Sequence, residues 1–144
     1  MSILNESITF NDTPFFEKSF TLDGKTDSEY IAESDTILKE IKEAVEINPF
    51  FKGRNAEKLS DFVFLAHACA DFAMLEGAEL SMYSDDTDNV IIYVIAPCFY
   101  LRLAAMMSLS KICRSAFDMT ISTPNDTEEC VISFGFDFSA RETL

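Results

Sequence analysis

Hydrophobic residues recur at helical spacing between charged ones over residues 26–47. Ile37 and Ile41 belong to this repeat, which is typical of a helix with one buried face. The stretch begins with TDSE, residues 26–29, which is a capping box: the Thr hydroxyl and the Glu carboxylate each bond the other residue's backbone amide. An Asn-Pro pair ends the repeat. The pattern predicts an amphipathic surface helix over 26–47.

A second helix is predicted from Asn55 to Gly77, where glycine suits the end of a helix. Residues 62–75 are apolar almost all round, so this helix is expected to be buried on most sides. Most of its polarity lies in one narrow stripe, made up of Ser60, Phe64, His67 and Asp71.

Residues 78–84 and 89–96 are predicted as paired strands joined by the turn DDTDN, and the first of them alternates, with Leu80 and Met82 on one side. The second strand is apolar on both sides, with Ile91, Tyr93 and Ile95 on one of them. Such a strand is expected at the centre of a sheet that is covered on both faces.

The rest of the chain predicts a third helix over 99–116 and a closing hairpin of 117–122 with 130–139. The order from residue 55 to 138 is then helix–hairpin–helix–hairpin. Residues 1–25 are expected to form an N-terminal hairpin, from runs 7–10 and 16–22, or an arm. The predicted fold is a single α+β domain over residues 1–144. It has an antiparallel sheet of about four to six strands and about three helices.

The amino-acid composition indicates whether the chain folds and what kind of partner it favours. The hydrophobic fraction of 48% is that of a folded globular chain. With 25 acidic and 11 basic residues, the net charge is −14. A negative field of this size repels nucleic acid and anionic lipid, and it favours a basic protein partner.

Cysteine spacing and the N-terminal sequence point to the cytoplasm. The four cysteines form no C-x-x-C pair, and each has apolar neighbours, so we expect reduced, buried thiols. The N-terminus MSILNESITF does not have the pattern of a secretory signal. Residues 89–110 are long enough to span a membrane, but Arg102 lies past their middle and Pro97 near it, which favours a strand followed by a helix.

His67 and Asp71 are the first candidate for a site, because residues four apart meet on one face of a helix. They fit two metal ligands, or a general base with its orienting carboxylate. They also fit a polar seam beside the core in which the two groups satisfy each other, and we favour this interpretation. Arg102 fits either a ligand for an anion or a side chain that reaches from the core to water.

Two further features are weighed as signs of a calcium site and of a phosphate site, and neither fits. The sequence SDDTDN, residues 84–89, does not have the glycine and the final glutamate of a calcium loop, so a turn bonded to its own backbone is expected. The chain has only four glycines and no glycine-rich phosphate loop. No cofactor and no metal is expected.

Phe50 and Phe51 fit aromatic anchors for a partner, or a hydrophobic staple between two helices, which we favour. Together with Ile91, Tyr93 and Ile95 they are the candidate partner-binding residues. The preferred hypothesis is a non-catalytic acidic interaction protein, such as an adaptor, chaperone, inhibitor or immunity-type protein, with a protein partner or a second copy. The alternative is a small-molecule-binding domain or enzyme with a Phe- and Met-lined pocket that uses His67, Asp71 and Arg102.

Overall fold

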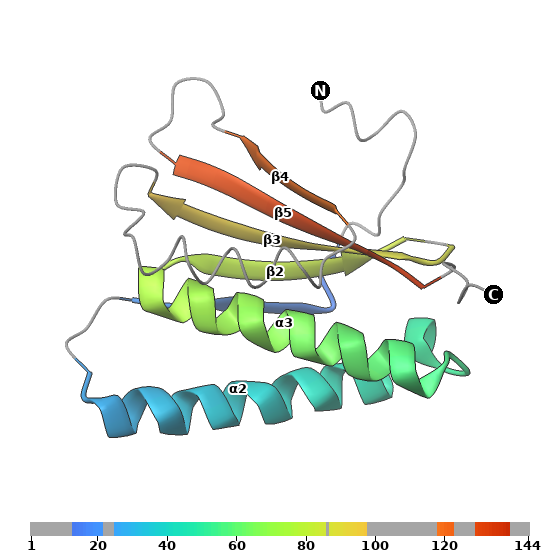
Figure 1. Ribbon diagram of the computed structural model, residues 1–144, viewed down its shortest axis with the longest axis horizontal. Coiled ribbons are helices and arrows are strands. Elements are labelled where there is room, and N and C mark those ends of the chain that lie inside the picture. The colour runs from blue at the N-terminus through green and yellow to red at the C-terminus, as the bar shows by residue number, and fades with distance from the viewer. Residues whose placement is uncertain (1–12, 22–24, 86, 98–117, 123–128, 139–144) are drawn as a thin grey trace.

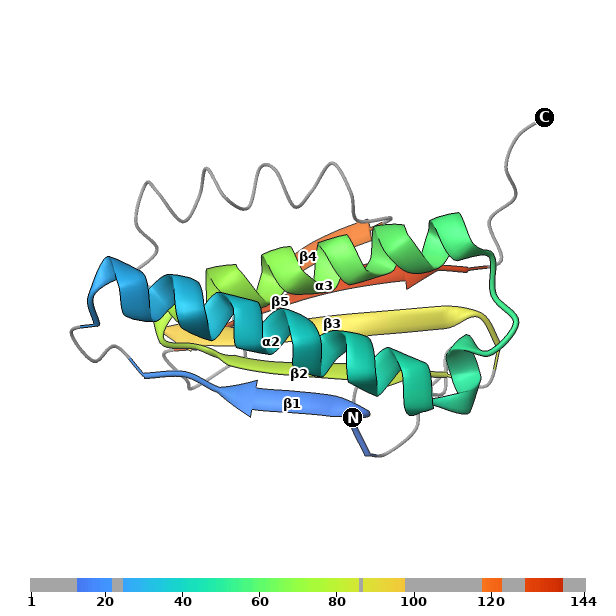
Figure 2. The ribbon, with the colours of Figure 1, turned by 90° about the horizontal axis from the view of Figure 1, so that it is seen from below.

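The computed structural model describes residues 13–21, 25–85, 87–97, 118–122 and 129–138. In these residues, two α-helices lie against one face of a five-stranded antiparallel sheet (Figure 1, Figure 2). The predicted α+β class with an antiparallel sheet is confirmed. Among the described residues, no helix is both long enough and apolar enough to cross a membrane.

The sheet has the strand order β1-β2-β3-β5-β4. Its strands are β1 (Phe16–Ser19), β2 (Glu79–Ser84), β3 (Asn89–Pro97), β4 (Asp118–Ser122) and β5 (Glu129–Asp137). The helices are α2 (Asp27–Ile47) and α3 (Ala56–Glu76), and the 3-10 turn η1 (Pro49–Phe51) joins them. The third predicted helix, 99–116, falls outside the described residues. The number of helices and the helix–hairpin–helix–hairpin order therefore stay predictions.

Helix α2 begins as its capping box predicts. The Glu29 amide donates to Thr26 Oγ1 at 3.2 Å, and the Thr26 amide donates to Glu29 Oε1 at 2.8 Å. These bonds satisfy backbone donors that have no partner inside the helix. Ile37 and Ile41 are fully buried, so they fix the face of α2 that meets the rest of the molecule.

Helix α3 is capped at both ends. The Asn55 side chain accepts from two amides of the first turn, those of Glu57 and Lys58, at 2.8 and 3.1 Å. Gly77 ends the helix in the left-handed conformation with φ +62°, which glycine adopts without the steric cost that a Cβ brings. The chain then turns directly into β2, so that α3 and the β2–β3 hairpin pack together as consecutive elements.

Strands β2, β3 and β5 bury alternate residues against the helices, as the two-residue period of a strand requires. In the register, the buried residues pair across the three strands: Leu80 with Val94 and Ile132, and Met82 with Ile92 and Phe134. The predicted pairing of the last two strands is confirmed, with Met119 opposite Phe134.

The N-terminal strand β1 pairs with β2 at the edge of the sheet, with Phe16 opposite Met82. Its other expected hairpin partner, residues 7–10, falls outside the described residues. On the helix face of β1, Lys18 Nζ lies 3.1 Å from Glu40 Oε1 of α2. This ion pair ties the edge strand to the first helix.

Two of the four cysteines, Cys69 and Cys130, lie among the described residues. Cys69 is buried in α3 and forms no disulfide, as expected for a core thiol. Cys130 is buried on β5, but it is disulfide-bonded, which differs from the expectation that all four thiols are reduced. Spacing along the chain cannot show which thiols meet in space, so the sequence held no signal for this bond.

Candidate functional site

His67 and Asp71 lie at the seam between α2 and α3, where Ser34 of α2 joins them. Ser34 Oγ is 2.7 Å from Asp71 Oδ1 and 3.0 Å from His67 Nε2. His67 Nε2 also lies 3.1 Å from the Ser34 carbonyl oxygen and 3.8 Å from Asp71 Oδ1. The structure thus brings a serine, a histidine and an aspartate into one cluster.

The direction of the hydrogen bonds separates this cluster from a catalytic triad. A carbonyl oxygen can only accept, so the contact with the Ser34 carbonyl requires a proton on His67 Nε2. The carboxylate of Asp71 accepts the hydroxyl proton of Ser34. In a nucleophilic triad, the imidazole nitrogen accepts that proton and the aspartate bonds the other ring nitrogen. The observed bonds make a polar clasp between two helices, in which His67 is not placed as a base for Ser34.

Neither His67 nor Asp71 lines either of the two hollows near the η1 turn. Among the described residues, no group of three His, Cys, Asp or Glu side chains could hold a metal. Arg102, the third member of the predicted ligand site, falls outside the described residues. The described contacts of His67 and Asp71 therefore fit a polar seam between two helices.

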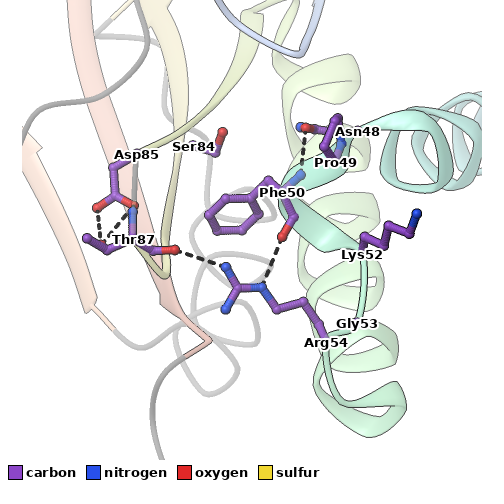
Figure 3. Close-up of a pocket in the computed structure, with 9 residues that line it drawn as sticks. All are labelled: Asn48, Pro49, Phe50, Lys52, Gly53, Arg54, Ser84, Asp85 and Thr87. Carbon is purple, nitrogen blue, oxygen red and sulfur yellow. Dashed lines mark hydrogen bonds between the residues drawn. The ribbon is translucent and has the colours of Figure 1, made fainter.

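The larger hollow, about 640 Å³, opens between the η1 turn and the turn that joins β2 to β3 (Figure 3). Arg54 spans it: Nε donates to the Phe50 carbonyl at 3.0 Å and Nη2 to the Thr87 carbonyl at 2.9 Å. Nη1 pairs with Asp88. The guanidinium group also stacks 4.5 Å from the Phe50 ring. Because its charge is neutralised by Asp88 and its donors hold two turns together, Arg54 acts as a structural clamp.

Asp85 ends β2 beside this hollow, and its carboxylate is buried. It accepts from the amides of Thr87 and Asn89 at 2.8 and 3.1 Å, and from the Asn89 side chain at 2.9 Å. Burial by itself raises the pKa of Asp85, but the hydrogen bonds from Asn89 and Thr87 together lower that pKa below its ordinary value of 3.8. The predicted interpretation of SDDTDN as a self-bonded turn agrees with these contacts.

Phe50 and Phe51 lie in an aromatic cluster beside the clamp. Phe51 is only 3% exposed and packs against Phe62, with ring centroids 5.3 Å apart. Phe50 is half-buried, and its ring meets that of Phe138 edge-on at 5.8 Å. Phe51 is therefore part of the core and is not accessible to a partner, as the staple interpretation expects.

The remaining candidates, Ile91, Tyr93 and Ile95, lie on the face of the sheet that points away from α2 and α3. We call it the outer face. Each of the three is partly buried, whereas the alternate residues of β3 are fully buried on the helix side. No described helix or strand covers the outer face (Figure 1). The expectation that β3 is covered on both faces is therefore not met by the described elements.

The register assembles an apolar stripe on the outer face. Tyr83 lies opposite Ile91, and Val131 lies opposite Ile95. The rings of Tyr83 and Tyr93 meet edge-to-face with centroids 5.9 Å apart. Burial raises the pKa of the Tyr93 hydroxyl above its ordinary value of 10.0, and the neighbouring Tyr83 adds to this increase. We define the apolar stripe as Tyr83, Ile91, Tyr93, Ile95 and Val131.

Sequence reasoning missed several residues that the structure makes important: Tyr83 and Val131 on the outer face, and Ser34, Arg54 and Asp88 in the two clusters. Ser34 is one polar residue among many on α2, and it precedes its partner His67 by 33 positions. Arg54 and Asp88 are 34 positions apart. Only the proximity of Arg54 to two phenylalanines was visible along the chain.

Neither a protein-family model nor a curated protein sequence matches this chain.

Proposed function

We propose that this protein is a non-catalytic protein-interaction module that binds its partner through the outer face of the sheet. The observation that carries the proposal is the apolar stripe across β2, β3 and β5, on a face that no described element covers. An antiparallel sheet with helices on one side ordinarily presents polar residues to water on the other.

The composition of the stripe favours an interface. Its centre is aliphatic and aromatic, with Ile91, Tyr93 and Ile95 in line on the central strand. Polar residues surround it, among them Ser81, Ser133 and Thr120. An apolar, aromatic centre inside a polar rim is the usual arrangement of a protein–protein interface, and tyrosine is enriched among the residues that dominate binding energy.

The alternative function, a small-molecule site at His67 and Asp71, has less support. The Ser34 hydroxyl donates to Asp71, and His67 Nε2 faces the Ser34 carbonyl, so the cluster does not have the nucleophile–imidazole pair of a catalytic triad. Its hydrogen bonds are accounted for by contacts between α2 and α3. This leaves the outer face as the better-supported functional surface.

Site-specific photo-crosslinking in the cells that produce the protein tests the proposal. A benzophenone amino acid replaces Tyr93 on the outer face in one variant and Phe64 on α3 in the other. Phe64 is a matched control because it is also aromatic and is 65% exposed on the helix layer. We expect a crosslink to a polypeptide from position 93 and none from position 64. Crosslinks from position 64 alone, or from neither position, would overturn the proposal.

A further inference from the structure

Ser81 on the outer face is surrounded by two acidic and two aromatic residues. In the register it lies between Glu17 of β1 and Tyr93 of β3. Along β2, Glu79 and Tyr83 lie two residues before and after it, so their side chains point to the same face. Neighbouring strands are about 4.8 Å apart, and alternate residues of one strand about 6.6 Å apart. A small side chain thus lies in the middle of four larger ones.

We infer that the partner of the outer face is a cationic protein segment that places an arginine or lysine side chain over Ser81. This inference rests on the proposed function. The two carboxylates of Glu17 and Glu79 supply negative charge, and the rings of Tyr83 and Tyr93 supply π faces on which a cation binds. We call this group of five residues the Ser81 socket.

The described charges support a cationic occupant. Glu17 and Glu79 are exposed, and no described lysine or arginine pairs with either of them. The one basic residue of β1, Lys18, lies on the opposite face and is paired with Glu40. The described part of the outer face therefore carries acids and no base. Opposite charge on the partner both attracts it and fixes its position.

A second copy of the chain is the less favourable occupant. Two copies that meet through the same face place acidic surfaces together, and each chain carries a net charge of −14. The apolar stripe alone would serve either partner. The acidic socket beside it favours a basic one.

The test is a titration followed by NMR of the tyrosine ring signals. The probe is a short peptide in which leucine and arginine alternate, and its twin has glutamate in place of arginine. We expect the arginine peptide to shift the Tyr83 and Tyr93 signals, and the glutamate peptide to shift neither. Glu17→Gln with Glu79→Gln is expected to weaken binding about five- to tenfold. Raising the salt concentration from about 0.05 M to 0.5 M should weaken it as well.

The control is Glu43→Gln with Glu46→Gln, which removes the same charge from exposed positions of α2. If binding responds to position and not to total charge, this variant keeps the affinity of the wild type.

Equal binding of both peptides at the tyrosines would overturn the cationic partner but leave the interaction face intact. Shifts confined to α2 and α3, or none with either peptide, would overturn the inference, and the crosslink at position 93 then decides the proposed function separately. A dimer by sedimentation that Tyr93→Asp dissociates would identify a second copy as the occupant and overturn the cationic one.

Discussion

At the turn between β2 and β3, the carboxylate of Asp85 accepts hydrogen bonds from the backbone and side chains of Thr87 and Asn89. These donors, which are fixed by the turn, stabilise the charged form in spite of burial. The same turn supplies Asp88 and the Thr87 carbonyl to Arg54. One carboxylate therefore shapes the turn that anchors the clamp.

Asp85→Asn tests this role. The variant keeps the size of the side chain but removes the charge, so we expect the free energy of unfolding at pH 7 to fall by about 2 kcal/mol. The folded-state pKa of Asp85 lies below the unfolded value of 3.8, so its contribution is present above pH 3.8 and is lost as pH falls through the folded pKa. Urea unfolding of both proteins from pH 7 downward measures the difference.

The matched control is Asp35→Asn on the exposed face of α2, which should change the unfolding free energy by less than about 0.5 kcal/mol. A difference between wild type and Asp85→Asn that stays constant to the lowest pH at which both proteins fold would show that the hydrogen-bonded charge is not the cause.

At the scale of elements, the seam between α2 and α3 depends on Ser34. Its hydroxyl links Asp71 and His67, which are both on α3, so one side chain holds two positions of the neighbouring helix. The apolar contacts of Ile37 and Ile41 pack the same pair of helices, and the polar clasp fixes how they align along their axes.

Ser34→Ala is expected to lower the free energy of unfolding by about 1–2 kcal/mol, because Asp71 and His67 lose a shared partner. It should leave the slow hydrolysis of an activated ester unchanged, because Ser34 is not a nucleophile in this cluster. Thr36→Ala is the control: its hydroxyl bonds only the Ala32 carbonyl within α2, so the change in stability should be a few tenths of a kcal/mol. Loss of ester hydrolysis in Ser34→Ala alone would restore the enzymatic interpretation.

At the scale of the whole molecule, an aromatic cluster joins the η1 turn, α3 and the end of β5. Phe51 lies at its centre, in contact with the rings of Phe15, Phe50, Phe62 and Phe138. Because these rings come from elements that are distant in sequence, the cluster closes the layer of helices onto the sheet. Phe64, which lies on the same helix as Phe62, takes no part in the buried core.

Phe51→Ala is expected to reduce the free energy of unfolding by about 3–4 kcal/mol, because it leaves a cavity inside the cluster. Phe64→Ala should change it by less than about 0.5 kcal/mol. Thermal and urea unfolding of the two variants give the comparison. Similar small losses in both would mean that Phe51 is not a core residue, and a role in partner binding would then regain support.

Features that depend on near neighbours along the chain can be predicted from the residues alone. The capping box at Thr26, the glycine that ends α3 and the alternation of β2 were all visible, because caps, turns and strand periods are set within a few residues. The self-bonded turn at Asp85 was visible for the same reason. These local rules were enough to predict the α+β class, the positions of α2 and α3, and two strand pairs of the sheet, β2 with β3 and β4 with β5.

Which distant residues meet depends on how the helices and strands pack in three dimensions. The clasp joins Ser34 to His67, the clamp joins Arg54 to Asp88, and the socket joins Glu17 to Ser81 and Tyr93. In each case the partners are separated by more than 30 positions, and the packing of whole elements sets their distance. The two faces of β3 are equally apolar in sequence. The helices bury one of them, and the other remains as the outer face.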